Sequence, residues 1–167
     1  RVADGTTTEV LRWIDDIDGR PFFMFAHYFD PHLPYSPPAP YDRMFDPDYE
    51  GRIGSSFDAE GFSEEKSKRF REMKVLTPED WNHIRSLYDG EIAYTDQAIG
   101  QLLNGLELRG LLKNTLVVFL ADHGEEFGEH GTFGHGSDLH IQSIHVPLVL
   151  RLPGIVPADV TAQEFVT

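Results

Sequence analysis

The chain contains no cysteine. This absence excludes disulfide bonds, cysteine-ligated zinc sites and a cysteine nucleophile within the 167 residues. Long apolar runs are also absent, and no stretch is long enough to span a membrane. Basic residues are scarce, because 14 Lys and Arg stand against 28 Asp and Glu, for a formal net charge of −14. Such an acidic surface repels a phosphate backbone, so the composition argues against a nucleic acid partner.

A length of 167 residues suits one domain with a substantial buried core. We therefore predict that residues 1–167 form a single segment of one domain. The chain begins with Arg1 instead of an initiator methionine and stops just after a strand-like segment. We interpret it as a piece of a larger protein.

Two stretches show the apolar spacing of three and four residues that is typical of an amphipathic helix. For the first, the threonine run at residues 6–8 predicts the N-cap, and Gly19 predicts the end. For the second, Thr77 and Pro78 predict the start, and Gly110 predicts the end.

Three apolar runs predict strands, at residues 22–26, 115–121 and 146–151. The first reads as buried on both faces, and the second also reads as a buried strand. A long connection with a helix joins the first two, which predicts a parallel crossover. Residues 30–76 lack periodicity and are expected to form a long irregular loop or insertion. The sequence thus predicts the α/β class, with a mixed or mostly parallel sheet and flanking helices.

Seven of the eight histidines fall in two windows, residues 27–32 and 123–145. The carboxyl ends of parallel strands share one rim of a sheet, and open α/β sheets place their active sites there. We therefore expect chain topology to gather the two windows at one site. The residues expected at this rim are His27, His32, Asp122, His123, Glu125 and His135.

Asp122 and His123 directly follow the predicted strand at 115–121. A carboxylate oxygen and an imidazole nitrogen together suit Mn²⁺ or Zn²⁺, whereas Ca²⁺ and Mg²⁺ prefer oxygen alone. In the alternative reading, Asp122 caps a turn and His123 is a hydrogen-bonded loop residue. The glycines that follow favour the metal interpretation, because they let backbone approach an ion or an anion closely.

The other histidines receive unequal roles. His135 is predicted to contact an anionic group, because a protonated imidazole donates from both nitrogens. His32 lies in a proline-fixed loop and is predicted to protonate a leaving oxygen, since imidazole exchanges protons near neutral pH. We expect His130 to order the loop, and we assign no chemistry to His140.

Four segments resemble the sulfatase family of the alkaline-phosphatase-like superfamily, and their order and spacing agree over essentially the whole chain. They are residues 21–35, 88–96, 121–131 and 146–154. The resemblance implies an alkaline-phosphatase-like fold, here incomplete. It also implies metal-dependent hydrolysis of the sulfate ester of a small molecule or a glycan.

By this resemblance, Asp122 and His123 match two ligands of a divalent cation, which the family suggests is Ca²⁺. His32 matches the histidine that assists the leaving group, and His135 falls near a position where many relatives carry an anion-binding lysine. That lysine is absent, so a phosphoester or phosphonate monoester hydrolase stays open as an alternative.

The nucleophile motif of sulfatases, Cys- or Ser-x-Pro-x-Arg, does not occur in the sequence. We therefore expect the chain alone to be inactive and to need the remainder of a parent catalytic domain. A non-catalytic metal-binding or interaction module is the alternative from a different class.

Overall fold

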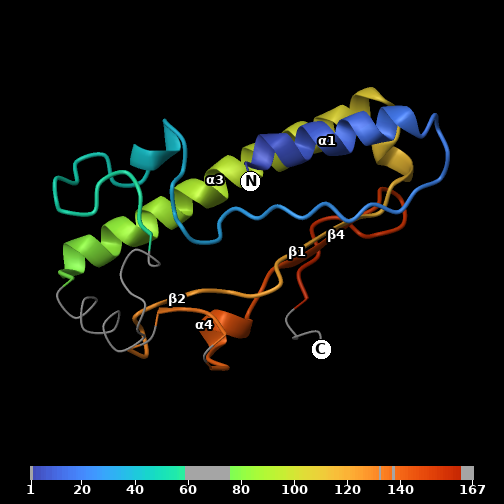
Figure 1. Ribbon diagram of the computed structural model, residues 1–167. Helices are drawn as coiled ribbons and strands as arrows, with labels where there is room; N and C mark the ends of the chain where they lie inside the picture. Colours follow the sequence, from blue (N-terminus) through green and yellow to red (C-terminus); the bar gives the residue numbers. More distant parts are fainter. Residues whose placement is uncertain (1, 59–75, 132, 137, 163–167) are drawn as a thin grey trace. The chain divides into compact units, whose positions relative to one another are not determined.

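A computed structural model describes residues 2–58, 76–131, 133–136 and 138–162 (Figure 1). The chain divides into two compact units, Arg1–Gly105 and Leu106–Thr167, which are described separately below. The assignment of residues 1–167 to one domain segment stays a prediction. Within the described ranges, none of the helices combines the length and the apolar character that a membrane crossing requires.

The long helix α3 (Pro78–Leu108) confirms the second predicted helix. Thr77 Oγ1 accepts the backbone N–H of Asp80 at 3.2 Å, and Asp80 Oδ2 accepts the backbone N–H of Thr77 at 2.9 Å. This reciprocal pair satisfies donors that the first turn of a helix leaves without partners. Beyond the other end, Gly110 adopts a φ of +72°, the left-handed conformation that commonly terminates a helix.

Helix α1 (Ala3–Asp16) starts earlier than the sequence predicted. Val2 occupies the N-cap without a side-chain cap bond, so the predicted capping role of residues 6–8 is wrong. Thr7 instead lies inside the helix and is buried, and its hydroxyl donates to the Ala98 carbonyl at 2.8 Å. The hydroxyl of Thr7 therefore bonds to another helix and does not cap the start of its own helix.

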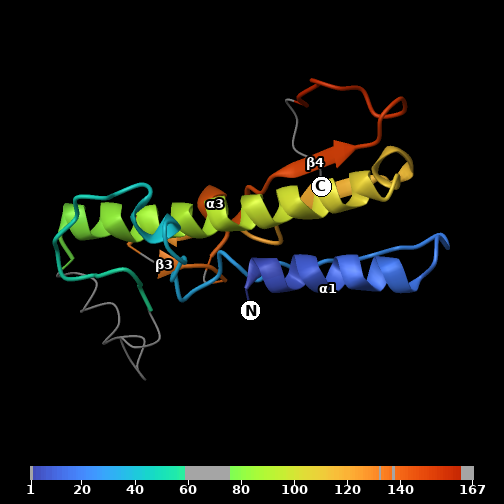
Figure 2. The ribbon, with the colours of Figure 1, turned by 90° about the horizontal axis from the view of Figure 1, so that it is seen from above.

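Helix α1 lies beside α3 and runs in the same direction (Figure 1), and Figure 2 shows the pair from above. Thr7 meets Ala98, and one turn further along α1 and two turns further along α3 Leu11 packs over Gly105, where a Cβ would lie 2.5 Å from the leucine. The first half of α3 packs instead against the loop that connects α1 to α3. The largest fully buried side chains of this unit are Tyr35, Ile84 and Leu87.

Residues 22–26 form no strand, so the predicted strand there is wrong. Exposure alternates along the segment, because Phe23 is 90% exposed and Phe25 is 75% exposed while their neighbours are half-buried. No strand of the described ranges pairs with these residues, so the predicted parallel pair with residues 115–121 is absent from them as well. An apolar run favours burial, but burial also requires a second layer to cover it.

The loop that follows has little regular structure up to residue 58. It holds a 3₁₀ turn, η1 (Tyr41–Arg43), and one isolated antiparallel bridge between Tyr35 and Phe57. Residues 59–75, which belong to the same predicted loop, lie outside the described residues. The assignment of the whole of 30–76 as an insertion stays a prediction.

The second unit contains two small antiparallel sheets, in which β1 pairs with β4 and β2 pairs with β3. In chain order its elements are η3 (Leu112–Asn114), β1 (Val117–Leu120), β2 (Glu126–Phe127), β3 (Phe133–Gly134), α4 (Ile141–Ile144) and β4 (Leu148–Arg151). Strands β1 and β4 confirm the predicted strands at 115–121 and 146–151. The side chains of both are largely exposed, so the burial expected of residues 115–121 is not found.

Candidate metal and anion site

The loop between β1 and α4 carries three of the four predicted site residues. Strand β1 ends at Leu120, and the chain then turns through glycines around the β2–β3 hairpin. Gly134 has a φ of +88°, which a residue with a Cβ rarely adopts, so the turn into His135 requires glycine.

Gly124 anchors this loop to the helical turn α4. Its backbone N–H donates to the Ser143 carbonyl at 2.7 Å. A Cβ at Gly124 would lie only 1.9 Å from the carbonyl oxygen of Gln142, so no larger residue fits without displacing backbone. Gly124, the residue that follows His123, is therefore held in place by close packing of main chain on main chain.

Asp122 and His123 project from the same turn. The Asp122 side chain is 78% exposed, and its Oδ1 lies 3.8 Å from His123 Nε2. His123 Nδ1 lies 2.8 Å from the Gly124 carbonyl oxygen. A carbonyl can only accept, so Nδ1 carries the hydrogen and the lone pair is on Nε2, as a metal ligand requires.

The two side chains fit one divalent cation. Ligand atoms at about 2.0–2.4 Å from an ion lie about 3 Å apart when adjacent and about 4.4 Å apart when opposite. The separation of 3.8 Å between Asp122 Oδ1 and His123 Nε2 falls inside this range. The exposed carboxylate can reach an ion without first breaking a tight ion pair.

His135 lies against the same imidazole. Its ring stacks on that of His123, with centroids 3.6 Å apart. His135 Nδ1 donates to Glu125 Oε1 at 2.9 Å, and the Glu125 side chain is only 4% exposed. The structure thus brings together three of the predicted residues, Asp122, His123 and His135, and Glu125 fixes the ring of the last.

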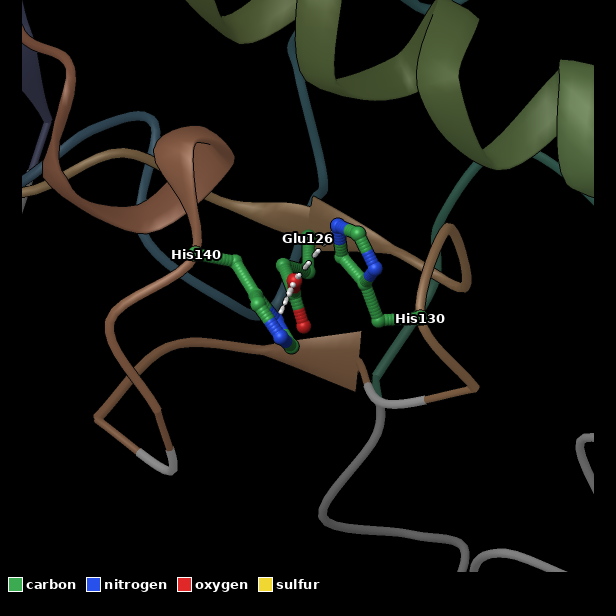
Figure 3. Close-up of side chains that lie close together, drawn as sticks. All are labelled: Glu126, His130 and His140. Carbon is green, nitrogen blue, oxygen red and sulfur yellow. Dashed lines mark hydrogen bonds and ion pairs between the residues drawn. The ribbon is translucent and has the colours of Figure 1, made fainter.

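A second group in the same unit was missed by the reasoning from sequence. Glu126, His130 and His140 offer ligand-type atoms that all lie within 4.8 Å of one another, so the described residues include a set that could hold a metal ion (Figure 3). The spacings of four and fourteen residues match no familiar ligand motif. The one signal that the sequence offered was the pair of adjacent glutamates, Glu125 and Glu126, within the histidine-rich window.

His32 belongs to the other compact unit. Its Nδ1 donates to the Leu33 carbonyl at 2.8 Å, and its ring stacks on Phe29 at 4.6 Å between centroids. These contacts fix the ring within its own loop. The expected approach of His32 to Asp122 stays a prediction.

Comparison with known proteins matches residues 3–167 to the family model described as Sulfatase. The chain is 28% identical to iduronate 2-sulfatase of Mus musculus, a match that covers 89% of this chain and 30% of that protein. It is 29% identical to an arylsulfatase of Clostridium perfringens, with 81% of this chain and 28% of that protein covered.

Among solved structures, the phosphonate monoester hydrolase of Agrobacterium radiobacter matches with a TM-score of 0.63 and 29% identity. The match covers 89% of this chain and 32% of that one. The chain thus spans about a third of the length of the proteins that it resembles. These neighbours confirm the predicted α/β, alkaline-phosphatase-like fold class.

Proposed function

This chain belongs to the sulfatase family, and from that premise we propose that the protein containing it hydrolyses a sulfate ester with the help of a divalent cation. The substrate is a sulfated small molecule or glycan. The similarity to an iduronate 2-sulfatase and to an arylsulfatase supports this class of reaction.

The observation that carries the proposal is the geometry of Asp122 and His123. Two ligand atoms lie 3.8 Å apart in a turn held by main-chain packing, with the histidine hydrogen already committed to Nδ1. Mn²⁺ and Zn²⁺ suit this oxygen and nitrogen pair, and Ca²⁺ is the ion that the family resemblance implies. A bound divalent cation would stabilise negative charge that develops on the ester oxygens.

His135 and His32 take the remaining roles available in this chain. His135, oriented by Glu125 and stacked on His123, contacts the anionic group of the substrate. His32 protonates the departing alcohol oxygen, which requires that its loop approach the turn at Asp122.

The nucleophile comes from residues other than these 167. The sequence has no cysteine and no Ser-x-Pro-x-Arg, and the chain spans only 30% of the iduronate 2-sulfatase that it matches. The purified 167-residue chain is therefore expected to turn over no aryl sulfate. Measurable turnover by this chain with no other protein present would contradict the assignment.

The test compares hydrolysis of an aryl sulfate by the full-length protein and by its Asp122→Asn variant. Asparagine keeps the shape of the side chain but removes its charge, so kcat/KM is expected to fall about 10²- to 10³-fold, the usual effect of losing one charge-stabilising group. Asp159→Asn is the matched control, because Asp159 is exposed in the same unit and its positive φ of 56° suits asparagine. Equal activity of both variants would remove Asp122 from the site.

A phosphonate or phosphate monoester hydrolase is the second candidate. The 29% identity to the phosphonate monoester hydrolase of Agrobacterium radiobacter favours it, as does the histidine at position 135. Parallel assays of the full-length protein with aryl sulfate, aryl phosphate and aryl phosphonate decide between the two. No turnover of any of the three would support a non-catalytic module.

A further inference from the structure

Two consecutive glutamates serve two different pairs of histidines. Glu125 accepts a hydrogen bond from His135, whose ring stacks on His123. Glu126 accepts one from His140 Nδ1 at 2.7 Å, and the rings of His140 and His130 lie 3.7 Å apart. The second set therefore shares no residue with the first.

We propose that Glu126, His130 and His140 form a second metal site, separate from Asp122 and His123, that binds a transition-metal ion such as Zn²⁺. Figure 3 shows the three side chains close together, with dashed lines joining the Glu126 carboxylate to both imidazoles. Glu126 Oε1 lies 2.7 Å from His140 Nδ1 and 3.8 Å from His130 Nε2. Ligands of tetrahedral zinc are separated by roughly 3.3 Å, so these two distances bracket the required spacing.

The chemistry of the three ligands selects the ion. Two imidazole nitrogens and one carboxylate oxygen form the ligand set of many zinc sites, while Ca²⁺ and Mg²⁺ need several more oxygens. Gln142 Oε1 lies 3.1 Å from His130 Nε2, so this amide oxygen or a water would be at hand as a further ligand once an ion replaced the hydrogens by which the two imidazoles now bond to Gln142 and Glu126.

The burial of Glu126 supports a bound cation, because it distinguishes this group from a cluster of exposed surface residues. The Glu126 side chain is 1% exposed, whereas those of His130 and His140 are 40% exposed. A buried carboxylate loses its hydration and must be offset by hydrogen bonds or by a cation. The half-exposed imidazoles leave a path by which an ion enters from solvent.

The site would fasten the β2–β3 hairpin to the residue that precedes α4. Glu126 starts β2, His130 lies in the following turn, and His140 immediately precedes α4. Asp138 Oδ1 accepts the backbone N–H of His140 at 3.1 Å and so fixes the approach of this ligand. A metal here would lock the loop that carries Asp122 and His123 against α4. Its main effect would be on the stability of the protein and not on the chemical step.

The experiment uses the full-length protein with an Asp122→Asn substitution, stripped of metal and dialysed against Zn²⁺ or Co²⁺. The expected result is uptake of one ion per chain, with X-ray absorption showing two imidazoles and oxygen around Zn²⁺. Adding His130→Gln or His140→Asn should weaken this binding at least 100-fold. In both variants an amide nitrogen takes the place of the ring nitrogen, so hydrogen bonds are kept while the ligand is lost.

His145→Gln is the matched control, since His145 is an exposed histidine outside the cluster, and it should leave metal uptake unchanged. The metal-free unfolding temperature of each variant, compared with that of its parent, shows whether the fold is intact. Zn²⁺ should raise the unfolding temperature of the parent but not that of the His140→Asn variant. Failure of the Asp122→Asn protein to take up Zn²⁺, or uptake that survives both histidine substitutions, would overturn the second site without touching the proposed ester hydrolysis.

Discussion

Replacement of Gly124 by alanine tests how tightly the turn that we propose to bind the metal is fixed. The new Cβ would lie 1.9 Å from the Gln142 carbonyl oxygen, whereas real Cβ atoms essentially never approach within 3.0 Å. The two backbones must therefore separate by about 1 Å or more. Such a shift stretches the bond of 2.7 Å from the Gly124 N–H to the Ser143 carbonyl beyond hydrogen-bonding distance.

The cost follows from these two effects. Overpacking of main chain costs about 1–3 kcal/mol, and the lost hydrogen bond costs about 0.5–1.5 kcal/mol. Gly124→Ala should thus lower the free energy of unfolding by about 2–4 kcal/mol. Because His123 moves with its neighbour, a displacement of about 1 Å should also lower kcat/KM for an aryl sulfate about 100-fold.

Denaturant unfolding and steady-state kinetics of the full-length protein measure both effects. Gly100→Ala is the control, because Gly100 lies in α3 and a Cβ there meets nothing within 4 Å. That substitution should raise stability by roughly 0.5–1 kcal/mol through helix propensity. If Gly124→Ala behaves like the control, the packing of this turn on α4 does not hold the site.

Two further predictions concern the first unit. Thr7→Val removes the hydroxyl bond to Ala98 and should lower the free energy of unfolding by about 1–3 kcal/mol, while Thr8→Val on the exposed face should change it by less than about 0.5 kcal/mol. Equal effects in denaturant titrations would refute the contact. Burial, followed by a hydrogen bond to Asp4, raises the pKa of Tyr94 from 10.0 to about 12, so the stability it contributes is complete below pH 10 and is lost as pH rises through 12. Tyr94→Phe should flatten that part of the stability profile, and an unchanged slope would contradict it.

Local signals in the sequence predicted the elements that depend on local chemistry. Thr77 and Pro78 set the start of α3, since a cap and a fixed φ act within one turn of the chain. The glycine-rich loop was predicted for the same reason, because a positive φ such as that of Gly134 is a property of single residues.

Features that depend on distant partners were not predictable in this way. Thr7 resembled a helix cap, but its partner Ala98 lies 91 residues away. The apolar residues 22–26 resembled a buried strand, yet Phe23 and Phe25 face solvent and no described strand pairs with the segment.

In the candidate site, too, neighbouring residues were predictable and residues brought together from a distance were not. Asp122 and His123 are adjacent in sequence, so a single turn brings them together and the pair was recognisable. Glu126 and His140 are brought together by a hairpin and a following turn. Whether His32 lies near Asp122 and His123 depends on how the two units are arranged, and no local sequence pattern determines that arrangement.

The central claim is that the turn at Asp122 and His123 holds the divalent cation used in ester hydrolysis. A crystal structure of the full-length protein soaked in Mn²⁺ tests it most directly, through the anomalous signal of the ion. The account predicts a peak within about 2.5 Å of both Asp122 Oδ1 and His123 Nε2, with the imidazole of His32 lining the same cleft. A peak elsewhere, with these two side chains away from any ion, would contradict it.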